Sequence, residues 1–502
     1  MTPRNNRKAI VAGAGFAGLS AAISLAHAGF EVTILEKHDQ TGGRARVWRH
    51  KGFSFDMGPS WYWMPEVIEQ FFQRFGRSIH DYISLQRLNP SYQVIFDKEE
   101  VIKIPAGYKD LKAVFEAIEK GSSTQLDNFI QQAAFKYEAA MKTYISKPGI
   151  HVKEYLNREV LSSLFRMDMF GAFSTHARKY FHSKKLLRII EFPVLFLGEA
   201  PEHIPAMYSL MNYADIIKGT WYPRGGMHEL CKAMTALAEE SGVTLRLNTE
   251  VKAFNVKENL ISGVVTDKEE LHADVIVAAM DYRHTDQELL PQGCSNYSSR
   301  YWDKRQMAPS CLLYFVGVKR KLPGLIHHNL FFEHDFAPHA ASIYKNKTWP
   351  EEPLFYICCP SKTDDTVAPQ GMENLFFLIP TAPGLQDTPE IREYFYEKVI
   401  AATEAFCKTS FRQDIIVQRS YACSDFVQDY NAFKGNAYGL ANTLRQTAIL
   451  KPSIRHKKIR NLFYTGQLTV PGPGVPPAII SGQVVAGHIT KTYKHAQHEV
   501  AF

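Results

Sequence analysis

Apolar and polar positions follow different periods along the chain, and the N-terminal block has the clearest pattern. An apolar segment over residues 9–12 leads into the turn GAGFAG, a run of small residues extends to Gly29, and a second apolar segment over residues 32–35 ends at an acid. Continuous apolar segments of this length predict buried strands, and the small-residue run between them predicts a helix that Gly29 ends. The block therefore predicts a βαβ unit with parallel strands.

The turn of this unit has the spacing GxGxxG, which is typical of dinucleotide binding. Gly13 permits the tight turn, Gly15 lets a pyrophosphate approach the backbone, and Gly18 lets helix and strand pack closely. The helix N-terminus offers free N–H groups to phosphates, and Glu36 is placed to accept hydrogen bonds from ribose hydroxyls. The residues predicted to bind the dinucleotide here are Gly13, Gly15, Phe16, Ala17, Gly18, Glu36 and Lys37.

The same block has a second interpretation as a secretory signal. Arg7 and Lys8 precede an uncharged run over residues 9–30, which contains a cleavage-like AHA. Three glycines at nucleotide-binding spacing, and a strand directly after the run, favour the nucleotide-binding interpretation.

A second uncharged run, over residues 461–490, has the length of a membrane-spanning helix. Its interior reads PGPGVPP, which would break such a helix. We expect instead a buried strand over residues 462–465, a tight loop, and a helix from about Ala478. No segment of the sequence predicts a membrane span.

Segments with the pattern of a nucleotide-binding domain recur in three separated stretches, so the domain is predicted to be discontinuous. The stretches between them differ: one is largely helical, and the other holds strand-like segments and an amphipathic helix over residues 389–408, with Thr388 as N-cap. The fold class predicted is α/β, a Rossmann-like domain with an inserted α+β substrate domain. The boundaries predicted are 1–85, 220–290 and 430–502 for the nucleotide-binding domain, and 86–219 and 291–429 for the substrate domain.

Composition narrows the class of protein further. The 502 residues are 45% hydrophobic and 22% charged, which are globular values. The net charge of +7 is spread along the chain, without the clustered basic stripe of a nucleic-acid binder. Seven cysteines without paired spacing indicate a reduced, cytoplasmic protein. The sequence has neither CxxC nor HExxH, so we predict no metal site.

A second glycine motif, Gly42-Gly43-Arg44, follows the βαβ unit. The segment FSFDMGP over residues 53–59 comes after it. A glycine pair lets the backbone pass close to a flat ring or a phosphate, and Arg44 can neutralise a diphosphate. A glycine-rich turn with a surface arginine is the alternative. Directly after a βαβ unit, the pattern favours flavin enzymes over nicotinamide dehydrogenases.

The motifs together resemble one family over essentially the whole chain. Their order is GxGxxG, GGR, FDxGP, WYPRGG from Trp221, YNAFKGNAYGLANTLRQ from Tyr430, and NLFYTGQLTVPGPGV from Asn461. This order is similar to bacterial and fungal phytoene desaturases, within the wider group of amine-oxidase-like flavoproteins. The segments PSWYWMP from Pro59 and EFPVLFLG from Glu191 resemble the flavobacterial variant.

The resemblance implies FAD as the cofactor and a glutathione-reductase-like arrangement of its domain. The pyrophosphate would lie on the first glycine turn and the ribose on Glu36. The flavin side and the adenine would be contacted by the remaining expected residues, Gly43, Arg44, Gly58, Pro59, Val251, Gly466, Gln467, Gly474 and Val475. Gln467 departs from the family, in which small residues and a His are usual nearby. No nicotinamide fingerprint is present, so we expect electrons to leave to oxygen or a quinone.

The resemblance also implies the reaction. A saturated CH₂–CH₂ beside a polyene loses a hydride to the flavin and a proton from the neighbouring carbon. Family proposals place an acid and an arginine near the helix expected over residues 179–191. Arg188 matches the arginine, but Ser183 stands near the place of the acid. Arg188 and Glu191 are the two candidate catalytic residues. A surface pair on the helix is the alternative reading of these two. His203 and Asp215 are expected to be satisfied core groups.

The function expected is FAD-dependent desaturation of an acyclic C40 carotenoid, from phytoene toward lycopene. A later-acting 3,4-desaturase of a hydroxylated carotene is the near alternative. A flavin amine oxidase and a non-enzymatic isoprenoid-binding protein are alternatives of other classes. A water-insoluble substrate implies peripheral, monotopic attachment to the membrane surface, through an apolar collar over residues 192–197 and 204–211 of the membrane-associating domain. No nucleic acid is expected as partner, and the oligomeric state stays open.

Overall fold

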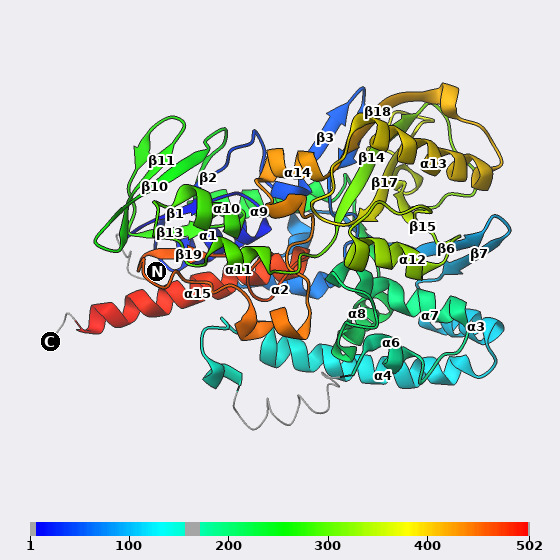
Figure 1. The fold of residues 1–502 in the computed structure, drawn as a ribbon, viewed down its shortest axis with the longest axis horizontal. Coiled ribbons are helices and arrows are strands. Elements are labelled where there is room, and N and C mark those ends of the chain that lie inside the picture. Colours follow the sequence, from blue (N-terminus) through cyan, green and yellow to red (C-terminus); the bar gives the residue numbers. More distant parts are fainter. Residues whose placement is uncertain (1–6, 156–170, 500–502) are drawn as a thin grey trace.

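Two β-sheets organise the chain in the computed structural model, which describes residues 7–155 and 171–499 (Figure 1). One sheet has five strands and lies toward the end of the molecule where both termini are found, and the other has seven strands and lies toward the opposite end. Helices cover both sheets and join them along the long axis.

The five-stranded sheet is parallel throughout and has the strand order β19-β13-β1-β2-β9. Its strands come from three separated stretches of the chain. They are β1 (Lys8–Ala12), β2 (Glu31–Leu35), β9 (Thr244–Arg246), β13 (Val275–Ala278) and β19 (Leu462–Tyr464). The central strand β1 is buried over four of its five residues. Ala9 and Val11 pack against helices on one face of the sheet, whereas Ile10 and Ala12 pack on the other face against a small antiparallel sheet that includes Phe254. The predicted Rossmann-like α/β fold is confirmed, and the N-terminal block is part of this core rather than a secretory signal.

The seven-stranded sheet is mixed and has the order β18-β14-β17-β16-β15-β6-β7. Its only parallel pair joins β15 to β6, and the other pairs are antiparallel. The strands are β6 (Tyr92–Asp97), β7 (Glu100–Ile104), β14 (Ser310–Val318), β15 (His328–Phe331), β16 (Phe355–Cys358), β17 (Glu373–Thr381) and β18 (Ile415–Tyr421). The hairpin β6–β7 was not predicted, since this stretch was expected to be largely helical. The division of the chain into domains stays a prediction that this strand membership supports.

The remaining strands form separate small sheets. Three of them form a separate antiparallel sheet, and two pairs form small ribbons. They are β10 (Val251–Lys257), β11 (Leu260–Thr266) and β12 (Glu270–Leu271), then β3 (Val47–His50) with β4 (Phe53–Asp56), and β5 (Leu85–Arg87) with β8 (Trp221–Pro223).

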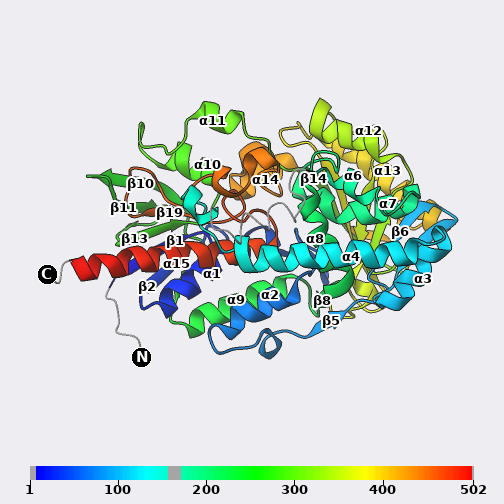
Figure 2. The same ribbon diagram turned by 90° about the horizontal axis from the view of Figure 1, so that it is seen from below.

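The helices form two groups, one on each side of the molecule, which Figures 1 and 2 show in two views. The nucleotide-binding side holds α1 (Phe16–His27), α2 (Pro65–Gln73), α9 (His228–Glu240), α10 (Tyr282–His284), α11 (Ser299–Asp303), α14 (Cys423–Tyr430) and α15 (Val475–Glu499). The other side holds α3 (Tyr108–Ile118), α4 (Ser122–Ala139), α6 (Phe173–Ala177), α7 (Lys184–Glu191), α8 (Leu210–Tyr213), α12 (Phe336–Ala341) and α13 (Pro389–Cys407). Helices α15 and α4 follow one another along the long axis in both views.

Helix α13 covers one face of the seven-stranded sheet. Its buried Phe395, Val399 and Ile400 pack against Leu312 and Phe377 of that sheet. The predicted N-cap is confirmed, because the Thr388 hydroxyl accepts a hydrogen bond from the Ile391 N–H at 3.4 Å. The opposite face of the sheet belongs to the main core, which continues into the nucleotide-binding side.

Helix α15 returns the chain to the first βαβ unit. A Cβ on Gly482 would lie 2.4 Å from the Ala17 carbonyl oxygen, so only glycine allows the observed contact of α15 with α1. The Ser20 hydroxyl donates to the Ile479 carbonyl at 2.6 Å across the same contact. The helix begins at Val475, three residues before the predicted start, because prolines are tolerated in a first turn. Within the described ranges, no helix has the length and apolarity needed to cross a membrane.

Candidate functional site

The turn between β1 and α1 has three glycines with different surroundings. A Cβ on Gly18 would lie 2.0 Å from the Gly13 carbonyl oxygen, and one on Gly13, whose φ is +110°, would lie 3.1 Å from the Ala279 backbone. A Cβ on Gly15 would meet nothing within 4 Å. Gly13 and Gly18 therefore shape the turn, whereas Gly15 faces open space at the N-terminus of α1. That open space is where an anionic group can approach the helix N–H groups.

The carboxylate of Glu36 is fixed beside this turn. Its Oε2 accepts from the Ala14 N–H at 2.8 Å and its Oε1 from the His38 N–H at 3.0 Å. Glu36 is buried at the end of β2, which is the position of the ribose-binding acid in this type of fold. Lys37 next to it points elsewhere, since its ammonium donates to the Gln428 carbonyl at 3.1 Å, and burial lowers its pKa.

The Gly42-Gly43-Arg44 segment lies directly against the first turn. The Gly42 N–H donates to the Ala14 carbonyl at 2.8 Å, and a Cβ on Gly43 would approach the Gly15 Cα to 3.3 Å. The Arg44 guanidinium donates to the Asn436 carbonyl at 3.2 Å and lies over the Tyr430 ring at 5.1 Å from its centroid.

Arg44 has a donor left over. Its Nε is buried and has no hydrogen-bond partner among the described residues. An unpaired donor on a buried guanidinium indicates that a polar group absent from the protein itself belongs there. The open space at Gly15 and this donor lie on the two neighbouring turns, so the residues present fit a dinucleotide with its diphosphate between them.

The segment with Gly58 and Pro59 completes this side of the site. A Cβ on Gly58 would lie 2.3 Å from the Arg44 carbonyl oxygen, so the two segments touch through their backbones. The Asp56 carboxylate accepts from the Met227 N–H at 2.7 Å and the His228 N–H at 3.0 Å, at the start of α9. Burial raises the pKa of Asp56 to about 6.

The C-terminal loop contacts the same place. A Cβ on Gly466 would lie 3.9 Å from the Ala17 side chain, and the Gly466 N–H donates to the Ser481 hydroxyl at 3.0 Å. The Gln467 amide donates to the Asn436 side chain at 3.1 Å, which links this loop to the residue that also contacts Arg44. Gly474, with a φ of +114°, directs the chain into α15 at Val475.

Of the expected cofactor residues, the structure therefore brings most of the set into one continuous group, through direct contacts between the first glycine turn, the GGR segment and the C-terminal loop. Val251 lies at the start of β10 and is buried. Lys37 is turned toward α14. The sequence did not identify Asn436 or Tyr430 as site residues, because each contributes through a contact with Arg44, which is distant in the sequence.

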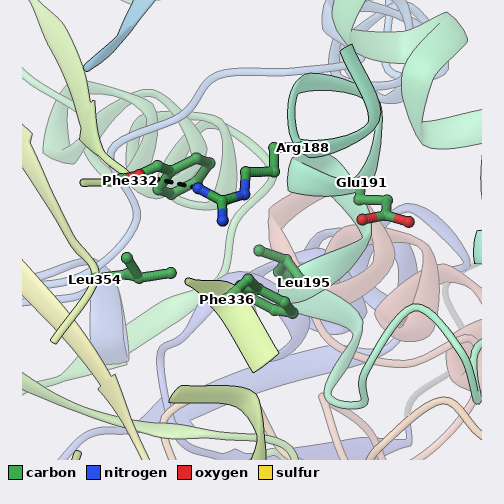
Figure 3. Close-up of a pocket in the computed structure, with 6 residues that line it drawn as sticks. All are labelled: Arg188, Glu191, Leu195, Phe332, Phe336 and Leu354. Atoms are coloured by element: carbon green, nitrogen blue, oxygen red, sulfur yellow. Dashed lines mark hydrogen bonds between the residues drawn. The ribbon is translucent and has the colours of Figure 1, made fainter. Parts of the chain in front are cut away.

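The candidate catalytic residues Arg188 and Glu191 lie on α7 and point to different sides (Figure 3). Arg188 donates to the Phe332 carbonyl at 3.1 Å and to Asp335 Oδ1 at 2.6 Å. Glu191 lies 3.6 Å from the Arg178 guanidinium. The two residues do not form the surface pair that the alternative reading described.

Glu191 is nevertheless unusual for a helix residue. Burial raises the pKa of its carboxyl to about 7, with Arg178 opposing the shift. Its Oε1 lacks a hydrogen bond within the described chain. It lines a pocket of about 240 Å³ together with Arg188, Leu195, Phe332, Phe336 and Leu354. Their catalytic role stays a prediction.

Two further polar residues have different outcomes. Asp215 is buried and accepts from the Tyr92 hydroxyl at 2.9 Å and the Thr220 hydroxyl at 3.1 Å, as expected of a satisfied core group. The expectation for His203 was wrong, because its side chain is 70% exposed and lies 3.5 Å from Glu199.

A group of aromatic rings centred on Trp61 follows directly after Pro59. Trp61 stacks on His328 at 4.0 Å between ring centroids, and its ring lies 5.3 Å from Phe192 and 5.5 Å from both Tyr92 and Tyr356. A small pocket adjoins the group. Its lining includes Phe55, Asp56, Ser60, Tyr222, Cys358 and Phe376. Sequence reasoning used the tryptophans only as family markers.

Comparisons with known proteins agree with this geometry. The family model for flavin containing amine oxidoreductases matches residues 16–490. The carotenoid 3,4-desaturase of Haloarcula japonica is 38% identical over 97% of this chain and 98% of its own length. The zeta-carotene-forming phytoene desaturase of Myxococcus xanthus is 30% identical over 98% and 95%. A solved oxidoreductase from Methanosarcina mazei superimposes with a TM-score of 0.63 at 15% identity, covering 96% of this chain and 100% of that one.

The chain belongs to the family of flavin containing amine oxidoreductases. It is an FAD-dependent oxidoreductase, and the expected cofactor is confirmed.

Proposed function

We propose that this protein is an FAD-dependent carotenoid desaturase, which introduces C=C bonds into an acyclic C40 polyene. The observation that carries the proposal is the aromatic group around Trp61, which continues directly from the Gly58-Pro59 segment of the cofactor site. A polyene offers no polar group for recognition, so an apolar and aromatic wall is the chemistry that binds it. The two carotenoid-desaturating relatives, similar over nearly their full lengths, support the same activity.

The protein residues hold and orient the cofactor, which supplies the hydride acceptor when it is bound. The N–H groups at Gly15 and the N-terminus of α1 would hold the diphosphate, and Glu36 would hold the ribose. The free Nε of Arg44 would donate a hydrogen bond to an oxygen of the cofactor. The N-terminus of α15, at the end of the glycine-rich loop, would stabilise negative charge on the cofactor.

The reaction also releases a proton from the carbon next to the one that loses hydride. Glu191 is the proposed acceptor, because its carboxyl titrates near neutral pH and has an oxygen without a hydrogen bond. Arg188 is proposed as a positioning residue, since Asp335 and the Phe332 carbonyl already fix its guanidinium at the wall of the same pocket. Oxygen or a quinone is proposed as the final electron acceptor.

The substrate is proposed to be phytoene, with lycopene as the product. A 3,4-desaturation is the second candidate, favoured by the relative at 38% identity, which is named for that reaction. Expression in a bacterium that accumulates phytoene separates the two. Coloured, more conjugated products support the first candidate. Colour formed only from a hydroxylated carotene, with phytoene untouched, moves the assignment to the second. Oxidation of an amine with peroxide release, and no change in any carotenoid, would contradict both.

Peripheral membrane attachment is proposed for delivery of such a substrate, but at a different surface from the expected collar. Phe192, Val194, Leu197 and Ile204 are buried, because the turn after α7 packs against the aromatic group around Trp61. Large apolar side chains are instead exposed in two segments that lie against each other. These side chains are Val152, Leu444, Ile449 and Leu450, which we call the apolar corner.

The two segments of the apolar corner meet at Gly149. A Cβ on Gly149 would lie 3.1 Å from the Val470 side chain and 3.3 Å from the Ala448 carbonyl. Lys153 and Arg445 flank the exposed side chains in the sequence. Apolar side chains bordered by cations suit an anionic lipid surface.

A further inference from the structure

Two histidines and a cysteine meet at the join of β15 and β16, beside the pocket that adjoins the aromatic group. His328 and Cys358 are directly opposite each other in the antiparallel register of these strands, and His327 precedes His328. All three are buried. One potential ligand atom from each lies within 4.8 Å of the other two. Neither the cofactor site nor the proposed reaction uses these side chains.

Both rings are held through Nδ1. His328 Nδ1 lies 2.6 Å from the Tyr356 hydroxyl, and His327 Nδ1 contacts the Thr363 hydroxyl. In the tautomer with its proton on Nδ1, each ring donates to its hydroxyl and has a free lone pair on Nε2.

Both Nε2 atoms are buried and lack a hydrogen-bond partner within the described residues. A buried acceptor without a partner is costly, and two of them beside a thiol point to a shared ligand. The Nδ1–H groups are held by hydroxyls in the way that outer hydrogen bonds orient metal-binding imidazoles.

We propose that His327 Nε2, His328 Nε2 and Cys358 Sγ bind one Zn²⁺ ion. Imidazole and thiolate are the ligands that zinc prefers, with bonds of about 2.0–2.1 Å to nitrogen and about 2.3 Å to sulfur. Tetrahedral bonds of that length place ligand atoms roughly 3.3–3.7 Å apart, so small rotations of the side chains complete the site. On binding, the Cys358 thiol gives its proton to solvent and the ion takes the thiolate.

The fourth position of this zinc would face the adjoining pocket, because Cys358 also lines it. The Asp56 carboxylate lines the same pocket and supplies negative charge near the ion. The ion would join β15 to β16 behind the ring of Trp61, which stacks on His328. Three protein ligands and one open position are the arrangement of zinc sites that can bind a further small ligand.

The neighbouring Cys359 provides a matched control. It lies on the other face of the sheet, in the core beneath α13, with its sulfur 3.6 Å from the Ser361 hydroxyl. Cys358→Ser and Cys359→Ser make the same chemical change on opposite faces of one strand end. The holoenzyme of each variant and of the wild type is loaded with Zn²⁺, dialysed against a weak chelator, and measured for zinc per chain.

The wild type and Cys359→Ser are expected to retain about one zinc per chain, and Cys358→Ser to bind zinc at least tenfold more weakly. His327→Gln is expected to behave as Cys358→Ser does. The X-ray absorption spectrum at the zinc edge of the wild type should show a first coordination shell of nitrogen ligands with one sulfur. A wild type that retains no zinc, equal zinc in the two serine variants, or a shell without sulfur would overturn the proposal. Because the X-ray absorption spectrum is measured on the wild type, it tests the ligand set even where a variant does not fold.

Discussion

Two glycines of the first turn are needed for different purposes: Gly15 for binding the cofactor, and Gly18 for folding. Gly15 has φ −72° and open space around its missing side chain, whereas a side chain on Gly18 would collide with the Gly13 carbonyl. The GxGxxG spacing predicted a different role for each glycine, and the surroundings of Gly15 and Gly18 differ in the same sense.

We expect Gly15→Val to lose bound FAD while its free energy of unfolding, measured without added cofactor, stays within about 0.5 kcal/mol of wild type. Gly18→Ala should instead lose about 1–3 kcal/mol, because the new Cβ overlaps backbone that cannot move freely. Flavin absorbance after gel filtration and urea denaturation of both variants check this. Normal flavin occupancy in Gly15→Val would show that the pyrophosphate lies elsewhere.

The buried carboxyl of Glu191 predicts how the stability of the folded protein changes with pH. Its pKa in the folded protein is raised by burial to about 7, from an ordinary value of 4.5. The folded protein therefore favours the protonated carboxyl, and wild type should lose stability relative to Glu191→Gln as the pH rises from about 4.5 to about 7. The loss is at most about 3 kcal/mol. Denaturation midpoints of the two proteins across this range check the sign.

The same titration of Glu191 predicts how the rate of desaturation depends on pH. If its carboxylate accepts the substrate proton, desaturation should increase as the pH rises through about 7, and Glu191→Gln should be slower at all pH values without that rise. Flavin occupancy should be unchanged. An identical pH profile in the variant would remove Glu191 from the reaction. The Arg188–Asp335 pair was not predictable, since no sequence pattern relates positions 147 residues apart.

At the scale of elements, strands and helices with strong periodicity were predicted well. Strands β1, β2, β13 and β19 and helix α13 form where the apolar pattern placed them. The hairpin β6–β7 was missed because Tyr92–Ile95 is buried on both faces, so its residues do not alternate in polarity. The hairpin joins β15 across more than 200 residues, which a local pattern does not encode.

The contact between α1 and α15 provides a test with an internal control. Gly482→Ala places a Cβ 2.4 Å from the Ala17 carbonyl and 2.7 Å from the Ala21 nitrogen, so it should cost about 1–3 kcal/mol and weaken FAD binding by displacing the N-terminus of α15. Gly487→Ala in the same helix meets nothing within 4 Å and should stabilise by about 0.5–1 kcal/mol. Equal effects of the two alanines, in thermal unfolding and FAD titration, would show that α15 is not held by this contact.

For the whole molecule, the motifs predicted the fold and the cofactor, but they did not predict which apolar side chains are exposed at the surface. The expected collar was placed by its apolar sequence, but its Phe192, Leu197 and Ile204 are buried, with Phe192 against Trp61. Apolar composition cannot distinguish a buried wall from an exposed surface when both are continuous in the sequence. The pairing of Leu444 and Ile449 with Val152 in one corner also depends on tertiary contacts.

Membrane attachment is predicted to depend on the apolar corner. Replacing Leu444, Ile449 and Leu450 together by Ser should reduce binding to anionic liposomes at least tenfold, because three partly exposed apolar side chains lose their contact with lipid. Val427, which is 48% exposed on α14, provides the control, and Val427→Ser should bind as wild type does. Flotation assays measure both. Equal binding of all three proteins would place the membrane contact on another surface.

The central claim is that this FAD oxidoreductase removes hydrogen from a carotenoid, and one anaerobic measurement tests it most directly. The purified holoenzyme is mixed, without oxygen, quinone or nicotinamide, with liposomes that contain phytoene or, separately, a hydroxylated carotene. We expect the oxidised flavin absorbance to disappear in one of these mixtures while a more conjugated polyene forms in equal amount. Flavin that stays oxidised with every carotenoid, but is reduced by an amine, would contradict the account.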